Sequence, residues 1–323
     1  MLIDQLLGRV GIRPGVARRR VPVLAVALGV ACAVLTGCGS GPNQAGAAVI
    51  VGNSSVSLAE VQQQVDAVLN QPELMARLTA QGNTAADIAR FKATREVQHL
   101  LLAQAATRDG IVVDDQQVDA ELAKPEIAQQ LQDGELVFDP VSARQATRDQ
   151  LIAEALTTKY LDRLAVTVDV TTATSRDEAV KKARLMASGP AQAAAVLAAD
   201  GPNAQRNLPL RAALVPQSAS LFLFGTPAGQ VVATQTSSSP DVWTVVRVTK
   251  RTTDGPPMGD PNATSVAQLG DQTMDQIGRR LTQPLAEELG VRVNPRYGIW
   301  DPLYLNVLPS TLEPSVVLSA VLS

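Results

Sequence analysis

The stretch Phe91–Leu122, FKATREVQHLLLAQAATRDGIVVDDQQVDAEL, decides the fold because it reads as two helices joined by a tight stop. Val97, Leu101 and Ala105 recur every four residues, which predicts one apolar helix face. Gly110 ends the first helix, since glycine readily adopts the left-handed conformation of a C-terminal cap. The stretch therefore predicts a helical scaffold.

Helix start signals occur on both sides of this scaffold. Thr84 is followed three residues later by Asp87, a pair typical of a capping box at a helix N-terminus. Asp114 and Gln117 have the same spacing and predict the start of the second helix. Ser57 precedes Glu60 in the same way, so an earlier helix is expected after a short strand.

The region Val49–Leu164 is expected to hold one strand and about five helices, the last starting at Asp139-Pro140. This order, with a helix ending in LLLAQAA and followed by GIVVDDQQVD, resembles the N-terminal chaperone region of SurA-type and PrsA-type secretion foldases. The resemblance implies helices that form a cradle for unfolded chains. It implies no catalytic residue in this region.

Composition limits the function classes that fit this chain of 323 residues. Apolar residues make up 46% but aromatic residues only 3%, so the core is built mainly of Ala, Val and Leu. The net charge is −3, and the basic residues include five arginines in the first 37 positions, which leaves an acidic body. An acidic body without a basic face excludes a nucleic-acid partner.

The first 37 residues are predicted to be an export signal. Residues 1–20 are basic, and the apolar run Val21–Leu35 is shorter than the roughly 20 residues that span a bilayer. The run ends in Leu35-Thr36-Gly37-Cys38, which resembles the lipobox of bacterial lipoproteins. The alternative is a plain signal peptide cleaved near Gly37, with Cys38 an incidental thiol.

The lipobox resemblance implies that Cys38 becomes the first residue and is linked to diacylglycerol. The protein is then expected at the extracytoplasmic face of the cell membrane, anchored by lipid. Cys32 lies inside the apolar run and is removed with it, so no disulfide is expected after cleavage. Residues 38–48 are small and polar and predict a flexible tether.

A second unit is expected over residues 166–250, and its element order resembles a parvulin domain. The expected order is strand, helix, loop and three strands: Val166–Val170, a helix opened by Ser175 and carrying Ala179, Ala183 and Met186, the loop Gly201–Pro209, and strands Leu221–Phe224, Val231–Thr234 and Val242–Val248.

Three positions bear on this resemblance. Phe224 and Gly229 match the family's Phe-x-x-x-x-Gly step, where the phenylalanine lines a proline pocket. Parvulin activity, as the family implies, uses two histidines, but Trp243 stands where the second belongs and the first strand has none. The single histidine of the chain, His99, lies in the helical scaffold. We expect a degenerate module that keeps Phe224, Gly229 and Trp243 as a pocket remnant and has no catalytic residue.

The C-terminal part is expected to contain a linker (251–264), a helix (265–292) and a tail (293–323) containing Tyr297, Trp300 and Tyr304. The helix is predicted over Ser265–Leu289, kinked or divided at Pro284. In SurA-type chaperones such a helix returns to complete the N-terminal cradle. Its packing residues are expected to be Leu269, Met274, Ile277, Leu281 and Leu285.

Other site chemistry has no support in the sequence. One histidine and one acylated cysteine cannot make a zinc site, and no glycine-rich loop carries the Lys-Ser/Thr pair of a phosphate loop. We expect no metal, no cofactor and no small-molecule substrate.

The sequence therefore predicts an α+β, mainly α, fold: a SurA-like helical domain (49–165) completed by a C-terminal helix, with a small parvulin-like α/β domain inserted. The expected function is a membrane-anchored chaperone that binds unfolded exported polypeptides and lacks isomerase activity. The alternatives are an active peptidyl-prolyl isomerase and a lipoprotein dedicated to one partner or to envelope assembly. An isomerase assay distinguishes the expected chaperone from an active isomerase. Client capture distinguishes it from a lipoprotein dedicated to one partner.

Overall fold

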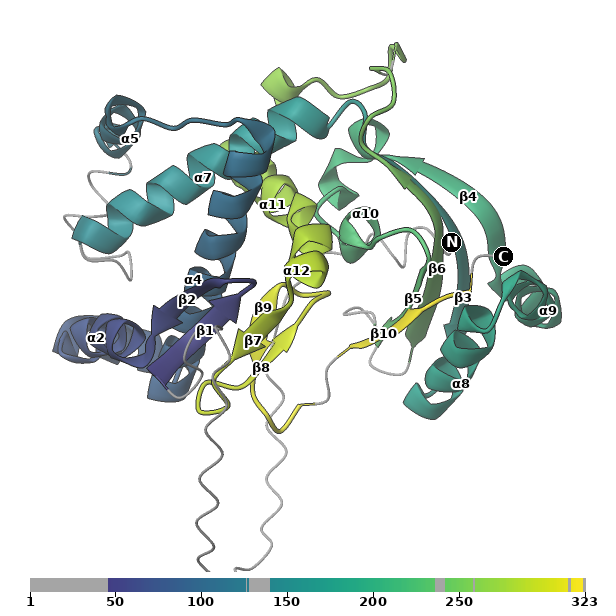
Figure 1. Cartoon of the computed structure of the whole chain (residues 1–323), viewed down its shortest axis with the longest axis horizontal. Coiled ribbons are helices and arrows are strands. Elements are labelled where there is room, and N and C mark those ends of the chain that lie inside the picture. Colours follow the sequence, from purple (N-terminus) through teal and green to yellow (C-terminus); the bar gives the residue numbers. More distant parts are fainter. Residues whose placement is uncertain are drawn as a thin grey trace, which may run out of the picture.

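Helix α4 (Ala85–Asp109) forms the centre of the N-terminal part of the chain (Figure 1). The Thr84 hydroxyl accepts a hydrogen bond from the Asp87 amide, and the Asp87 carboxylate accepts one from the Thr84 amide. The predicted capping box is therefore confirmed. Gly110 closes the helix at a φ of 67°, in the left-handed region. The computed structural model describes residues 46–125, 127, 140–235, 242–257, 259–312 and 315–321.

Short capped helices surround α4. Ser57 and Asp114 each make the capping box that the sequence predicts. The elements that precede the second unit are strands β1 (Ala47–Val51) and β2 (Ser54–Ser57) and helices α2 (Leu58–Leu69), α3 (Pro72–Ala80), α5 (Asp115–Leu122) and α7 (Pro140–Tyr160).

The C-terminal segment returns to this part of the molecule. It contributes a 3₁₀ turn η5 (Val266–Gln268), helices α11 (Asp271–Leu281) and α12 (Gln283–Leu289), and strands β7 (Val291–Val293), β8 (Ile299–Asp301) and β9 (Asn306–Leu308). We call the elements β1 to α7 together with α11 to β9 the helical body. Strand β7 pairs antiparallel with β1, which gives a three-stranded sheet in the order β2-β1-β7.

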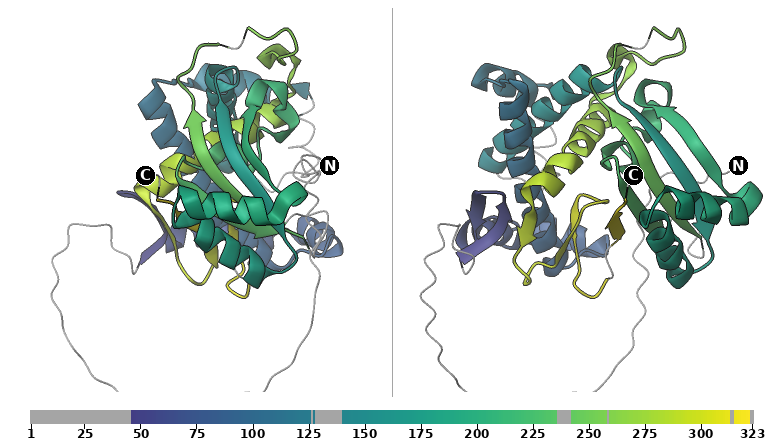
Figure 2. Two further views of the ribbon diagram at one scale, coloured as in Figure 1. Left: turned by 90° about the vertical axis from the view of Figure 1, so that its right-hand side faces the viewer. Right: turned by 45° about the vertical axis from the view of Figure 1, so that its right-hand side comes forward.

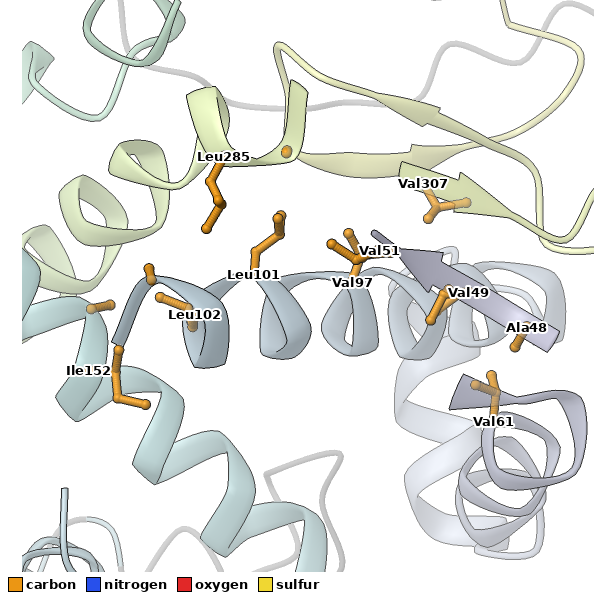
Figure 3. Packing of buried hydrophobic residues seen from close by; sticks show 14 of the residues in the cluster. Ala48, Val49, Val51, Val61, Val97, Leu101, Leu102, Ile152, Leu285 and Val307 are labelled. Atoms are coloured by element: carbon orange, nitrogen blue, oxygen red, sulfur yellow. The ribbon is translucent and has the colours of Figure 1, made fainter. Parts of the chain in front are cut away.

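The core of the helical body lies between α4 and the returning segment. Val97 and Leu101 of α4 are fully buried, as the apolar stripe predicts. Leu285 of α12 and Val307 of β9 belong to the same buried cluster and lie on the same side of α4 (Figure 3). The C-terminal segment therefore completes a core that the N-terminal helices leave open.

Helix α11 packs on α7 at very short range. A Cβ on Gly278 would lie 1.9 Å from the carbonyl oxygen of Ala153, so only glycine fits at this crossing. The Thr157 hydroxyl donates to the Met274 carbonyl at 2.6 Å. The predicted helix Ser265–Leu289 is wrong in its start, because the Ser265 cap opens only the turn η5. The predicted division near Pro284 falls at Thr282, between α11 and α12.

The second unit, which we call the α/β unit, is a five-stranded antiparallel sheet with helices, in the order β10-β5-β6-β3-β4. It lies beside the helical body (Figure 2). Its elements are β3 (Ala165–Ala173), α8 (Arg176–Ala187), α9 (Pro190–Asp200), η2 (Gly201–Asn203), β4 (Gln205–Arg211), η3 (Ala212–Leu214), η4 (Pro216–Ser218), α10 (Phe222–Gly225), β5 (Gln230–Gln235), β6 (Trp243–Thr252) and β10 (Val316–Ser319).

The two faces of the α/β sheet are both covered. Ala179, Ala183 and Met186 of α8 are fully buried on one face, as the sequence predicts. On the other face, Phe224 of α10 and Ile277 of α11 share a cluster with alternate residues of β3 and β6. Helix α11 therefore packs against both the helical body and the α/β unit. This corrects the expectation that its apolar residues all face the N-terminal helices, since Leu269 and Ile277 pack on the α/β unit instead.

Several predicted elements of the α/β unit differ from the structure. Leu221–Phe224, predicted as a strand, forms the short helix α10, because a four-residue apolar run does not specify its own secondary structure. The predicted loop Gly201–Pro209 contains most of β4, a polar edge strand. Strand β6 extends to Thr252, into the predicted linker 251–264. The tail supplies β10, which the sequence did not predict.

The aromatic residues of the tail fix it to the body of the molecule. Tyr297 is buried in the core of the helical body, and Trp300 packs against that core. Tyr304 is 45% exposed, and its hydroxyl lies 3.2 Å from the hydroxyl of Thr234 in β5. The tail therefore contacts both parts of the molecule.

Candidate functional site

The predicted lipidation site lies outside the described residues. Leu35, Thr36, Gly37 and Cys38 all precede residue 46, where the described chain begins. Among the helices that the structure describes, none combines the length and the apolar character needed to cross a bilayer. The lipid anchor on Cys38 stays a prediction.

Phe224, the predicted lining of a proline pocket, is enclosed by the chain itself. Its side chain is only 1% exposed. Val246 of β6 and Ile277 of α11, both fully buried, belong to the same cluster. The space over the Phe224 ring is therefore taken by α11 and its neighbours.

Gly229 has a structural role in the turn before β5. Its φ of 84° is in the left-handed region, which explains the glycine. Its amide donates to the Val248 carbonyl at 2.8 Å, and its carbonyl accepts the amide of Ala320 at 2.7 Å. The residue thus joins β5 to both neighbouring strands.

Trp243 begins β6, opposite Ala173 of β3 and Gln235 of β5. Its indole packs with Val245 and the α8 face of the sheet, whereas Phe224 packs with Val246 and Val248. Successive side chains of a strand point to opposite faces. The structure therefore places Trp243 and Phe224 on opposite faces of the sheet and does not bring the three predicted pocket residues together.

The helical body contains a small polar cavity between α2, α4 and α7. Its volume is about 20 Å³, which holds roughly one water molecule. The Gln64 amide donates to the Glu96 carboxylate at 2.7 Å across the helices. The lining residues are Gln64, Lys92, Arg95, Glu96, Ser142, Gln145, Ala146 and Asp149. A cavity of this size is too small to enclose a peptide side chain and offers no client site by itself.

His99 and Asp149 extend this polar group between α4 and α7. The His99 Nδ1 lies 2.8 Å from the Asp149 carboxylate, which is only 3% exposed. The hydrogen bond that the His99 ring donates to the Asp149 carboxylate raises the pKa of His99. Burial lowers the pKa of the neighbouring Arg95, whose guanidinium lies 3.9 Å from Asp149. The sequence alone did not reveal this group, because its residues are fifty positions apart.

Arg280 joins the helical body to the α/β unit. Its guanidinium donates to the carbonyls of Ser220, at 2.8 Å, and Leu303, at 2.7 Å. Burial of the guanidinium lowers the pKa of Arg280 to about 10, so the group stays charged at neutral pH. A Cβ on Gly225 would lie 2.4 Å from the Gln283 side chain, so α10 fits this junction only with glycine.

Comparison with known proteins identifies the N-terminal part. Residues 17–140 match the protein family described as the SurA-like N-terminal domain. Among solved structures, the chain is similar to the foldase protein PrsA of Lactococcus lactis, with 11% identity, a TM-score of 0.25 and coverage of 77% of this chain and 95% of that chain. It is also similar to the foldase protein PrsA of Streptococcus pneumoniae, with 12% identity, a TM-score of 0.22 and coverage of 76% and 94%. No curated protein matches the chain.

The family match confirms the predicted SurA-like N-terminal region. The helices and sheets of the structure itself confirm the predicted α+β fold class. The family match ends at residue 140, where α7 begins, so it covers the part of the helical body that precedes α7.

Proposed function

We propose that this chain, whose N-terminal region is SurA-like, is an extracytoplasmic chaperone that binds unfolded exported polypeptides at the membrane surface. The observation that carries the proposal is the match of residues 17–140 to the SurA-like N-terminal domain. The structure adds support, because the α4 core is completed by the C-terminal segment, as expected for a SurA-type domain.

The proposed chaperone has no prolyl isomerase activity. Phe224, the predicted pocket residue, is 1% exposed and belongs to the same buried cluster as Ile277 of α11. Trp243 stands where a second catalytic histidine would be, and it lies on the opposite sheet face. His99, the single histidine of the chain, is in α4. These placements support a parvulin-like module that has lost its chemistry.

A proline-limited refolding assay tests this part of the proposal. The barrier to peptide-bond isomerisation is about 18–20 kcal/mol, so an active isomerase accelerates such a refolding step clearly. We expect no acceleration by the wild-type chain. Acceleration that is lost in Phe224→Ala and kept in the matched control Phe222→Ala would establish an active isomerase instead.

The anchor is proposed to be the lipid on Cys38. Cys38 lies shortly before β1 (Ala47–Val51) in the sequence, so a lipid on Cys38 would hold β1 close to the membrane. In Cys38→Ala cells we expect the protein to be released from the membrane or left uncleaved. Membrane retention with normal cleavage in this variant would refute the lipid anchor.

Client capture separates a general chaperone from a protein dedicated to one partner. A photo-crosslinking residue at an exposed position such as Val112, 82% exposed, samples contacts without disturbing the core. A chaperone is expected to yield many unrelated exported polypeptides, in amounts that rise when folding is stressed. Capture of one protein at constant amount would favour the dedicated-partner alternative.

A further inference from the structure

The outer edge of β5 is covered by a distant segment of the same chain. Strand β10 pairs antiparallel with β5, with Val316 opposite Ala233 and Ser319 opposite Gln230. Strand β10 follows β9 of the helical body in the sequence, and Figure 1 shows it beside β5. The edge strand of the α/β sheet is therefore supplied by the C-terminal tail and not by the continuous stretch of chain that forms the rest of the α/β unit.

The two strands of this pair differ in burial. Val231, Val232 and Ala233 of β5 are fully buried. The residues Val316–Leu318 of β10 are only half-buried, and Ser319 is exposed. A buried β5 edge needs a strand beside it, because its unpaired amides and carbonyls would otherwise face solvent. The strand that covers it is only partly buried, and an edge strand of this kind opens at a lower free-energy cost than a buried one.

The end of the tail is held in place through its own main-chain groups. The Ala320 amide donates to the Gly229 carbonyl at 2.7 Å, and the Val321 amide donates to the Ala187 carbonyl at 2.9 Å. The Arg247 guanidinium donates to the Val321 carbonyl at 3.3 Å. These contacts do not depend on the side chains of the tail, so other sequences can make them.

The tail also packs on the α/β unit through every second side chain. Val316, Leu318 and Ala320, at every second position, pack against the cluster between the sheet and α8. The edge of β5 therefore fits an extended segment with apolar residues at alternate positions. Such segments are common in strands that are buried on one face in folded proteins, and they become accessible when those proteins unfold.

We propose that the β5 edge is a binding site for extended apolar segments of unfolded exported polypeptides, which replace the chain's own Val316–Ser319. This inference rests on the proposed chaperone function and adds where and how a client is bound. The tail competes as a tethered ligand at an effective concentration on the order of millimolar. A client segment is thus admitted only when the tail strand has opened.

Two proline substitutions in β10 distinguish release of the tail from a general effect of proline in this strand. In an antiparallel pair every second amide points at the partner strand. The amide of Ala320 bonds to Gly229, so the amide of Leu318 also points at β5 and that of Ser319 points away. Leu318→Pro is expected to release the tail, whereas the matched control Ser319→Pro keeps the pairing.

The probe is a fluorescent synthetic peptide, SVVLSAV, which has the sequence of residues 315–321. Binding is measured by anisotropy on the full chain. We expect Leu318→Pro to bind the peptide at least about 10-fold more tightly than wild type, because the tethered competitor is gone. Ser319→Pro is expected to bind like wild type. Equal affinity of Leu318→Pro and wild type would overturn the proposal.

A disulfide provides a second test that does not depend on how Leu318→Pro folds. Val232 and Val317 face each other in a pair whose amides point away from one another, with a typical Cα separation of about 4.5 Å that a disulfide can bridge. Val232→Cys with Val317→Cys, in a chain that also carries Cys32→Ser and Cys38→Ser, locks the tail when oxidised. We expect peptide binding in the reduced form and its loss in the oxidised form.

The same locked chain distinguishes failure of this inference from failure of the proposed function. Its ability to keep chemically denatured citrate synthase from aggregating is compared in the oxidised and reduced forms. A lower activity in the oxidised form supports the site. Equal activity in both forms would refute the site and leave the chaperone function standing, whereas no activity in either form or in wild type would refute the chaperone function itself.

Discussion

Strands β7 and β10 both come from the C-terminal segment, and each adds to a sheet formed earlier in the chain. Strand β7 follows α12 directly, and Leu285 and Ala286 of α12 are part of the core of the helical body. Strand β10 follows strand β9 in the order of the described elements and is only partly buried along its length. The comparison shows that strand addition has two different outcomes in this molecule. Strand β7 is fixed to the helical body by the core residues of α12, whereas β10 covers the β5 edge of the α/β unit in a way that allows exchange.

The largest loss of stability is expected from a substitution that disturbs α11, the helix that leads through α12 into β7. Gly278→Val places a side chain where even a Cβ would lie 1.9 Å from the Ala153 carbonyl oxygen. Separation of α11 from α7 is expected to lower the free energy of unfolding by about 3 kcal/mol or more, measured by urea denaturation. Gly270→Ala is the matched control, because no atom lies within 4 Å of its Cβ position. Equal stability of the two variants would contradict the close packing of α11.

Proline substitutions compare β7 and β10 directly. The Gly52 amide bonds to Gly290 and the Asn294 amide to Ala48, so the amide of Arg292 in β7 also points at β1. Arg292→Pro is expected to lower the free energy of unfolding by about 2–3 kcal/mol. Leu318→Pro in β10 is expected to cost about 1 kcal/mol or less, because only the tail detaches. The reverse order in urea denaturation would mean that β10 is the fixed strand.

Arg280 tests whether the two parts behave as one cooperative unit. Arg280→Met leaves the carbonyls of Ser220 and Leu303 without this donor and is expected to cost about 2 kcal/mol. Calorimetry is expected to show the unfolding transition of the α/β unit separating from that of the helical body. Arg292→Met, which removes an exposed charge from β7, is the control. A single transition at an unchanged temperature in Arg280→Met would show that the junction depends on other contacts.

The smallest effect concerns the helical body alone. Asp149 raises the pKa of His99 above its usual 6.5, so protonated His99 stabilises the folded state. This contribution is fully present below pH 6.5 and is lost as the pH rises through the raised pKa. The stability of the wild-type chain relative to His99→Gln is therefore expected to fall between about pH 6 and pH 8. Because His99 is the single histidine, a difference that does not change with pH in this range would contradict the assignment.

The parts of the fold that the sequence predicted are those set by local chemistry. The capping boxes at Ser57, Thr84 and Asp114 and the left-handed cap at Gly110 need only residues within one turn, and all four were predicted. The SurA-like region was predicted because these signals follow one another in a fixed order.

The parts that were missed depend on distant residues. Strand β10 exists because β5 presents an edge to it, and nothing in VVLS itself signals a strand with that partner. The apolar run that ends at Gly225 is a helix in its tertiary context, where Gly225 lies against Arg280 of α11 and Gln283 of α12. His99 gave no sign of its partner Asp149, which lies on another helix. The β5 edge was missed for the same reason.

The central claim, that the chain is a chaperone for unfolded polypeptides, is tested most directly by light scattering. Chemically denatured citrate synthase is diluted into buffer with increasing amounts of the purified chain, and with serum albumin as a control. We predict that scattering falls in proportion to the added chain and is largely suppressed near equimolar amounts. Scattering that matches the albumin control at every ratio would contradict the chaperone function.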